Sequence, residues 1–187
     1  DSSRPHLAEV PHLFAQITQD TSQKFIVIPA HSSENREYIP MGFLDSSNIA
    51  HNSCLIVSGA RPFLFGILSS RMHMNWINSV CGRLETRTRY SKNIVYNNFP
   101  FPSIDLEMKE KINRSVYEIF KVREKYSEKT LADLYDPDTM PKGLKEAHYQ
   151  NDLVIESCYQ DKKFNNDEER LEVLFELYEK MIQQEKN

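Results

Sequence analysis

The chain has 187 residues, of which 40% are apolar, so it can form a hydrophobic core in one large domain or two small ones. Its formal net charge of -4 at pH 7 argues against a uniformly basic nucleic-acid-binding protein. The charge is unevenly distributed, because residues 1–102 carry nine Lys/Arg and seven Asp/Glu, whereas residues 103–187 carry fourteen and twenty. An anionic partner is therefore expected to bind the N-terminal part.

Several functional classes find no support in the sequence. The three cysteines lack metal-ligand spacing and are typical of reduced thiols in a cytosolic protein. The longest apolar runs are too short to cross a membrane, and no glycine-rich loop is present to hold a cofactor. Asp105, Glu107 and Lys109 superficially resemble a nuclease cluster, but their spacing fits the solvent face of a helix. We therefore predict no catalytic and no metal-binding residues in this chain.

The first hundred residues are predicted to mix strands with one helix. Residues 24–29, 38–44 and 54–57 are rich in β-formers, and a polar turn separates the second from the third. Pro62 is suited to the first turn of a helix. A stripe of apolar residues every four positions then predicts a helix that ends before Gly82 and includes Leu64, Leu68, Met72, Trp76 and Val80. Residues 83–96 are predicted to form a strand.

A boundary follows at Pro100 and Pro102, because two prolines in three residues continue neither a helix nor a sheet. Beyond it the apolar spacing predicts three helices, over 105–126, from about Pro141 and from about Asn166, the last with Glu169 placed for a capping box. The predicted fold class is therefore α+β. A small mixed α/β domain of residues 1–102 precedes an all-helical domain of residues 103–187.

The most distinctive segment lies between Arg83 and Lys92, where four cations and one acid alternate with small or apolar residues. In an extended strand Arg83, Glu85, Arg87 and Arg89 would share one face, because side chains repeat every second residue. An Arg side chain can bind O6 and N7 of guanine, and a Glu carboxylate can accept from N4 of cytosine. The pattern predicts contact with base edges in DNA, with flanking cations on phosphates.

Each of these signals also has a purely structural interpretation. The charges of residues 83–92 could protect a solvated edge strand from aggregation. Arg71, Asn75 and Asn78 lie together on the predicted helix, where they could simply form its polar side. Residues 32–36 could form an ordinary loop. Residue pattern alone leaves these alternatives open.

The sequence contains a series of distinctive phrases: EYIPMGFL at 37–44, SRMHMNW at 70–76, CGRL at 81–84, RYS at 89–91, IVYNNFPFP at 94–102 and LADLYDPDTMP at 131–141. Their order and spacing extend over about residues 28–178, most of the chain. They resemble one family, the MmeI-like single-chain restriction–modification enzymes of types IIG and IIL.

The resemblance implies a parent enzyme that joins a nuclease, a helical spacer, an adenine-N6 methyltransferase and a target-recognition domain with a helical tail. This chain resembles the last two parts and is expected to catalyse nothing by itself. Its start at Asp1 also suggests a piece of a longer protein, although a trimmed chain would look the same. The implied partners are double-stranded DNA and the methyltransferase domain of the same parent chain. S-adenosylmethionine and a divalent metal are expected in the parent enzyme only.

The resemblance also assigns roles to individual residues. In such enzymes an acidic and a basic residue, two apart and just before the Arg-Tyr-Ser phrase, contact a base pair, and the matching positions are Glu85 and Arg87. We predict that Arg83, Arg89 and Lys92 hold backbone phosphates or orient the loop. The secondary candidates for DNA contact are Ser33, Arg36, Arg71 and Asn75.

Two functions from different classes follow from these observations. The first is a sequence-specific double-stranded DNA recognition module of a bifunctional restriction endonuclease and adenine-N6 DNA methyltransferase. It predicts binding that weakens steeply with salt, because phosphate contacts release counterions. The alternative is a non-catalytic protein–protein interaction module whose acidic helical tail makes the contact, and it predicts little salt-dependent affinity for DNA.

Overall fold

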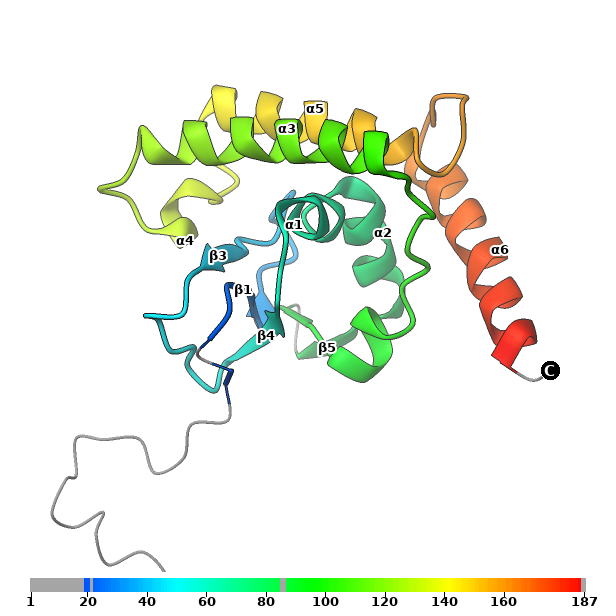
Figure 1. The fold of residues 1–187 in the computed structure, drawn as a ribbon, viewed down its shortest axis with the longest axis horizontal. Coiled ribbons are helices and arrows are strands. Elements are labelled where there is room, and N and C mark those ends of the chain that lie inside the picture. Colours follow the sequence, from blue (N-terminus) through cyan, green and yellow to red (C-terminus); the bar gives the residue numbers. More distant parts are fainter. Residues whose placement is uncertain (1–18, 21, 85–86, 186–187) are drawn as a thin grey trace, which may run out of the picture.

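The structure is a computed structural model that describes residues 19–20, 22–84 and 87–185 (Figure 1). In this part of the chain, two three-stranded antiparallel sheets and several helices precede a helical C-terminal region. The predicted α+β class is therefore confirmed.

The first sheet has the order β3-β1-β4. Its central strand β1 (Phe25–Pro29) consists largely of β-branched and aromatic residues, and it pairs antiparallel with β3 (Gly42–Leu44) and β4 (Cys54–Ser58). The strand predicted over residues 38–44 is shorter than expected. Pro40 has no N–H to donate to a ladder, and Tyr38 and Ile39 are instead buried in the core.

The second sheet has the order β2-β6-β5. It consists of β2 (His31–Ser32), β6 (Arg87–Arg89) and β5 (Gly82–Leu84). The single strand predicted over residues 83–96 is wrong. The chain reverses between Leu84 and Arg87, which pair with each other, and then forms η2, a π-helical turn over Lys92–Tyr96.

The helix predicted from Pro62 to Val80 is also divided, into α1 (Pro62–Leu68) and α2 (Arg71–Val80). Ser70 has extended backbone angles, and its hydroxyl accepts a hydrogen bond from the His73 N–H at 3.4 Å. Ser70 is therefore the N-cap of a second helix, which a periodicity of apolar residues cannot detect. Trp76, from the predicted stripe, is fully buried.

The C-terminal region contains α3 (Leu106–Glu124), α4 (Leu131–Leu134), α5 (Lys142–Glu156) and α6 (Asp167–Glu185). The three long helices begin close to the predicted positions, whereas the short α4 was not predicted. Figure 1 shows α3 and α5 lying side by side across α1, and α6 running beside α2. Asp105 is the N-cap of α3, where its carboxylate accepts from the Met108 N–H at 2.7 Å.

One hydrophobic core extends across the predicted boundary at residue 102. Buried residues of α1 and α2 belong to the same cluster as Ile112 and Val116 of α3 and residues of α5 and α6. Gly66 shows how closely α1 and α3 approach, because a Cβ atom there would lie 2.6 Å from a methyl group of Ile112 and 2.8 Å from one of Val116. The helical region is therefore packed into the rest of the chain rather than appended to it.

Candidate nucleic-acid interface

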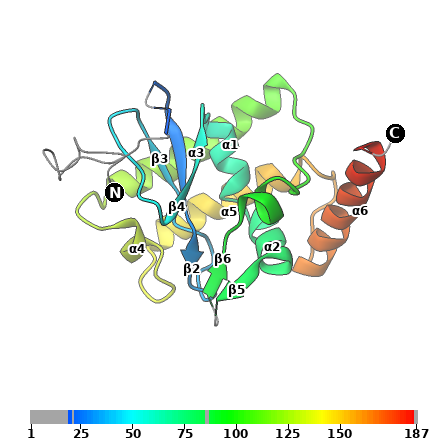
Figure 2. The same cartoon turned by 90° about the horizontal axis from the view of Figure 1, so that it is seen from below.

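The second sheet presents a basic face to solvent. Arg87 and Arg89 of β6 are exposed, whereas Thr88 between them is buried, as the alternation of a strand requires. His31 pairs directly with Arg89 and is also exposed, and Ser32 pairs with Thr88 and is buried. We call His31, Arg87 and Arg89 the basic face, and Figure 2 shows its strands at the edge of the molecule beside α2.

The position of β6 weakens the structural interpretation of these charges. β6 lies between β2 and β5, so Arg87 and Arg89 belong to the central strand of the sheet and do not protect an edge. In the part of the chain that the structure describes, none of the ion pairs involves Arg87, Arg89 or Lys92. Among the described residues, no carboxylate therefore neutralises these three charges.

Arg83 lies on a different strand from Arg87 and Arg89, contrary to the prediction. Arg83 pairs with Thr88, whereas Arg87 and Arg89 pair with Leu84 and Gly82, so Arg83 does not fall in the same alternation as the other arginines. The prediction that one strand carries all four charged residues on one face is therefore wrong. Glu85 lies outside the described residues, and its contact with a base remains a prediction.

Tyr90 attaches the end of β6 to α2. Its hydroxyl lies 2.9 Å from Nε2 of His73, which is fully buried, and its backbone N–H donates to the Ala30 carbonyl at 2.9 Å. Burial lowers the pKa of His73 to about 3, so the imidazole is neutral at physiological pH. The direction of the hydrogen bond depends on the tautomer of this ring. The contact fixes the strand immediately after Arg89.

A second attachment lies in η2. The indole N–H of Trp76 donates to the Val95 carbonyl at 3.0 Å, and the Ser91 hydroxyl accepts from the Ile94 N–H at 3.4 Å. Lys92, at the start of η2, is exposed. Sequence reasoning did not identify Tyr90 or Ser91 as structural anchors. The sequence did contain one indication for Tyr90. Tyr90 lies two residues after Thr88, so in an extended strand it faces the buried side of the sheet, opposite to Arg87 and Arg89.

Two secondary candidates form a turn beside the basic face. The Arg36 N–H donates to the Ser33 carbonyl at 3.3 Å, which closes a turn directly after β2. Because β2 is antiparallel to β6, this turn lies at the Arg87 end of β6. The Arg36 side chain also reaches the Ala132 carbonyl at 3.1 Å. The predicted loop at residues 32–36 therefore lies close to the candidate interface.

The other two secondary candidates, Arg71 and Asn75, bind Asp167 of α6. The Arg71 guanidinium donates to both carboxylate oxygens, at 2.9 and 3.0 Å, and the Asn75 amide donates to one of them at 3.0 Å. These contacts give both residues an intramolecular role, and their contact with DNA remains a prediction. A hollow of about 300 Å³ here brings together residues of the turn, α2 and α6, namely Arg36, Glu37, Arg71, Met74, Asn75, Asn78 and Asp167.

The described residues contain neither a metal-binding cluster nor a membrane-spanning helix. Among them, no group of three or more His, Cys, Asp or Glu side chains is arranged to hold a metal ion. The acids that resembled a nuclease cluster act locally, because Asp105 caps α3 and Glu107 pairs with Lys111 at 2.8 Å. None of the described helices is long and apolar enough to cross a membrane.

The fold and the site define a class of α+β module. In it, α2 holds a short ribbon with a basic face, and the helical C-terminal region shares one hydrophobic core with the rest of the chain. Comparison with known proteins identifies the family. Residues 1–103 match the family described as "MmeI, target recognition domain", and residues 104–184 match "MmeI, C-terminal domain". The chain belongs to this MmeI family, as the resemblance in its sequence predicted.

Two relatives illustrate the relationship. DNA methyltransferase A of Bacillus subtilis (strain 168) is 44% identical over 183 residues, which cover 98% of this chain and 21% of the relative. A solved structure of the type IIL restriction–modification enzyme MmeI in complex with DNA is 39% identical, with a TM-score of 0.85. That match covers 98% of this chain and 24% of the other. The chain thus spans between a fifth and a quarter of the length of these relatives.

Proposed function

We propose that this chain is the sequence-specific double-stranded DNA recognition module of a bifunctional restriction endonuclease and adenine-N6 DNA methyltransferase. The observation that carries the proposal is the basic face, whose Arg87 and Arg89 are exposed on the central strand of a short ribbon without a carboxylate partner among the described residues. Family membership supports it, as do the solved DNA complex of one relative and the methyltransferase name of another.

The proposed mode of binding follows from the shape of the ribbon. The major groove is wide enough to admit a two-stranded β-ribbon, so the connected end of β5 and β6 enters it first. Arg87 is the residue of β6 closest to that end, and with Glu85 it contacts a base pair. Arg89 and Lys92 lie nearer the anchors at Tyr90 and η2, where they and Arg83 hold phosphates.

The remaining activities belong to the proposed parent enzyme. Its methyltransferase domain is the partner of this chain and uses S-adenosylmethionine, and its nuclease uses a divalent metal. The chain itself supplies no catalytic group and directs both reactions by choosing the DNA sequence. We place the enzyme in the cytoplasm, together with its DNA substrate.

Fluorescence anisotropy with duplexes of random sequence tests the electrostatic part of the proposal. The full-length protein that carries this chain is measured at about 50 mM and about 200 mM salt. Binding that weakens at least about tenfold supports phosphate contacts, whereas affinity that does not depend on salt contradicts them and favours a protein–protein module. Arg89→Ala should lower the slope of log affinity against log salt by about one. Lys180→Ala, which removes an exposed cation of α6, is the matched control.

A second experiment tests base recognition. The charge exchange Glu85→Lys with Arg87→Asp is introduced into the full-length enzyme, and its methylation sites are mapped. The preferred base pair at one position of the target should change, because the groups that donate and accept hydrogen bonds are exchanged. An unchanged target sequence would remove both residues from the recognition mechanism.

A further inference from the structure

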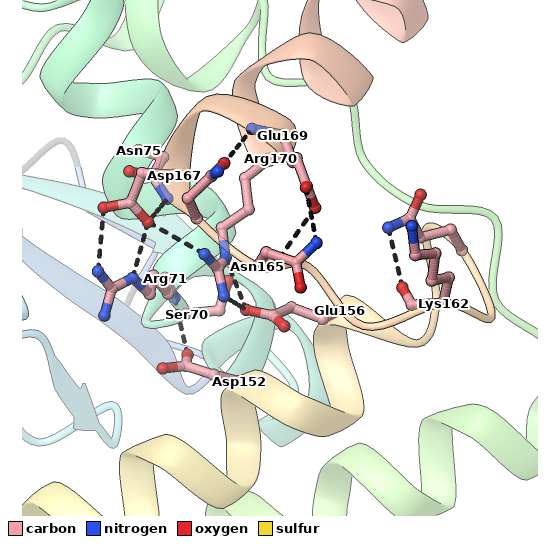
Figure 3. A network of polar contacts seen from close by, with 12 residues as sticks. Ser70, Arg71, Asn75, Asp152, Glu156, Lys162, Asn165, Asp167, Glu169 and Arg170 are labelled. Carbon is pink, nitrogen blue, oxygen red and sulfur yellow. Dashed lines mark hydrogen bonds and ion pairs between the residues drawn. The ribbon is translucent and has the colours of Figure 1, made fainter.

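Carboxylates from two C-terminal helices hold the beginning of α2 (Figure 3). Asp152 of α5 accepts from the Arg71 backbone N–H at 2.7 Å and from the Tyr38 hydroxyl at 2.6 Å. Asp167 of α6 binds the Arg71 side chain and the Asn75 amide, and Arg170 lies 3.2 Å from the same carboxylate. The two carboxylates therefore hold both the backbone and the side chains of the first turns of α2.

The geometry of Asp167 is directional. Two parallel N–H···O bonds from one guanidinium fix the relative orientation of the two groups as well as their distance. The hydrogen bond from Arg71 is the main reason that the pKa of Asp167 falls to about 2. Arg71 and Asp167 are 44% and 41% exposed, so water screens their attraction and the pair contributes little to overall stability. Its main effect is to set how α2 lies against α6.

α2 in turn fixes the ribbon that carries the basic face. Its C-terminal end continues through Cys81 directly into β5. Its His73 side chain contacts the Tyr90 hydroxyl, and its Trp76 side chain donates to the Val95 carbonyl. Tyr90 and Val95 follow β5 and β6 along the chain, so α2 holds the ribbon at both of its ends. A rotation of α2 therefore moves β5, β6 and η2 together. Productive contacts with a ligand tolerate displacements of only about 0.5 Å.

We propose that Asp167 is a positioning residue for base recognition, which sets the orientation of α2 and, through α2, the approach of the basic face to the DNA groove. This inference rests on the proposed function. It makes the helical C-terminal region part of the recognition mechanism, although its excess of acidic residues makes it unsuited to broad contact with phosphates.

The test compares Asp167→Asn with Glu168→Gln in the full-length protein. Glu168 is exposed and adjacent, so its substitution makes the same change in charge without removing the bidentate contact. The wild-type target is first obtained by selecting bound duplexes from a random pool. Affinities are then measured for that target and for a duplex with one mismatched base pair in it. For Asp167→Asn the ratio of the two affinities should fall at least about fivefold, since a misplaced bidentate contact loses its discrimination.

The outcomes separate the possible roles of Asp167. A ratio that falls for Asp167→Asn, but changes less than about twofold for Glu168→Gln, supports positioning. A purely structural role would lower the amount of folded protein and reduce both affinities equally, so an unchanged ratio overturns the proposal. If Arg71 itself contacts DNA, its release from Asp167 would instead strengthen binding to both duplexes and steepen the dependence on salt, which also overturns it.

Two further results keep the test decisive. Should Asp167→Asn fail to fold, Arg71→Lys retains the charge but lacks the planar fork of a guanidinium, and the ratio should again fall. If the wild-type protein selects no sequence from the pool, the proposed function fails, and with it this inference. A selective wild type whose Arg71→Lys and Asp167→Asn variants keep the same ratio overturns the inference alone.

Discussion

The attachment of Tyr90 to His73 can be tested by removing a single oxygen atom. His73 is fully buried, and burial keeps its imidazole neutral at neutral pH by lowering its pKa to about 3. Its Nε2 lies 2.9 Å from the Tyr90 hydroxyl, while its Nδ1 has no hydrogen-bond partner within the described residues. Tyr90→Phe therefore leaves a ring nitrogen of a fully buried side chain without its partner.

The expected cost follows from that geometry. A buried polar group left unsatisfied costs about 1–3 kcal/mol, and the aromatic ring itself is retained, so no cavity of the size of a side chain forms. We expect the free energy of unfolding to fall by about 2 kcal/mol. Because the imidazole is neutral in the folded state, the loss should be the same at pH 6.5 and pH 8, unlike the loss of a contact to a charged histidine.

Urea denaturation of the 187-residue chain, followed by circular dichroism, measures this difference. Tyr117→Phe is the matched control, because the Tyr117 side chain is 57% exposed on α3. Its unfolding free energy should change by less than about 0.5 kcal/mol. If Tyr90→Phe lowers the free energy of unfolding by less than about 0.5 kcal/mol, the contact between Tyr90 and His73 is not the anchor of β6.

Three other substitutions test the packing and the buried polar groups. Gly66→Ala should destabilise the chain by about 1–3 kcal/mol, measured by urea denaturation, because its methyl group would overlap with Ile112. Burial raises the pKa of Asp152 to about 7, so the folded state keeps a proton that the unfolded state releases near pH 4. The contribution of Asp152 to stability should therefore fall as pH rises from about 4 to about 7, by up to about 4 kcal/mol, whereas the contribution of the buried neutral His73 rises over much of the same range. The free energy of unfolding of the wild type minus that of Asp152→Asn should accordingly be more positive at pH 5 than at pH 8, measured by urea denaturation. Arg123→Lys should lower the melting temperature, because a lysine cannot reproduce the simultaneous contacts of Arg123 with the Tyr135 hydroxyl and the Met41 carbonyl.

Features specified by neighbouring residues were predicted well. Pro62 marks the start of α1, Pro141 precedes α5, and Asn166 lies directly before α6. At this last position the Asn166 side chain accepts from the Glu169 N–H at 2.9 Å, while the Glu169 carboxylate binds Asn165. Proline geometry and capping depend on a few adjacent residues, so a single sequence contains the information needed to place them.

Features that depend on distant residues were not predicted. The alternation of residues 83–96 continues past Arg89, but the chain reverses after Leu84 because β6 pairs with both β5 and β2, and β2 lies far earlier in the sequence. The residues between β5 and β6 include no Gly or Asn, which are the usual signals of a tight turn. The role of Asp167 was missed for the same reason, since its partners Arg71 and Asn75 are 96 and 92 residues away.

The acidic character of the helical region has a structural explanation that the average charge conceals. Asp152, Glu156 and Asp167 are directed toward α2 and Arg170, where they accept hydrogen bonds instead of facing an external partner. Hydrogen bonds accepted by acidic side chains of the C-terminal part thereby orient the helix that holds the basic face, while contact of this acidic part with DNA phosphates is unfavourable. The contacts of Asp152 and Asp167 with α2, like the hydrophobic core, join residues before and after position 102. The smallest unit that preserves the geometry of the basic face therefore includes α3, α5 and α6 as well as the two sheets. A transfer of the sheets alone would leave α2 without the carboxylates that orient it.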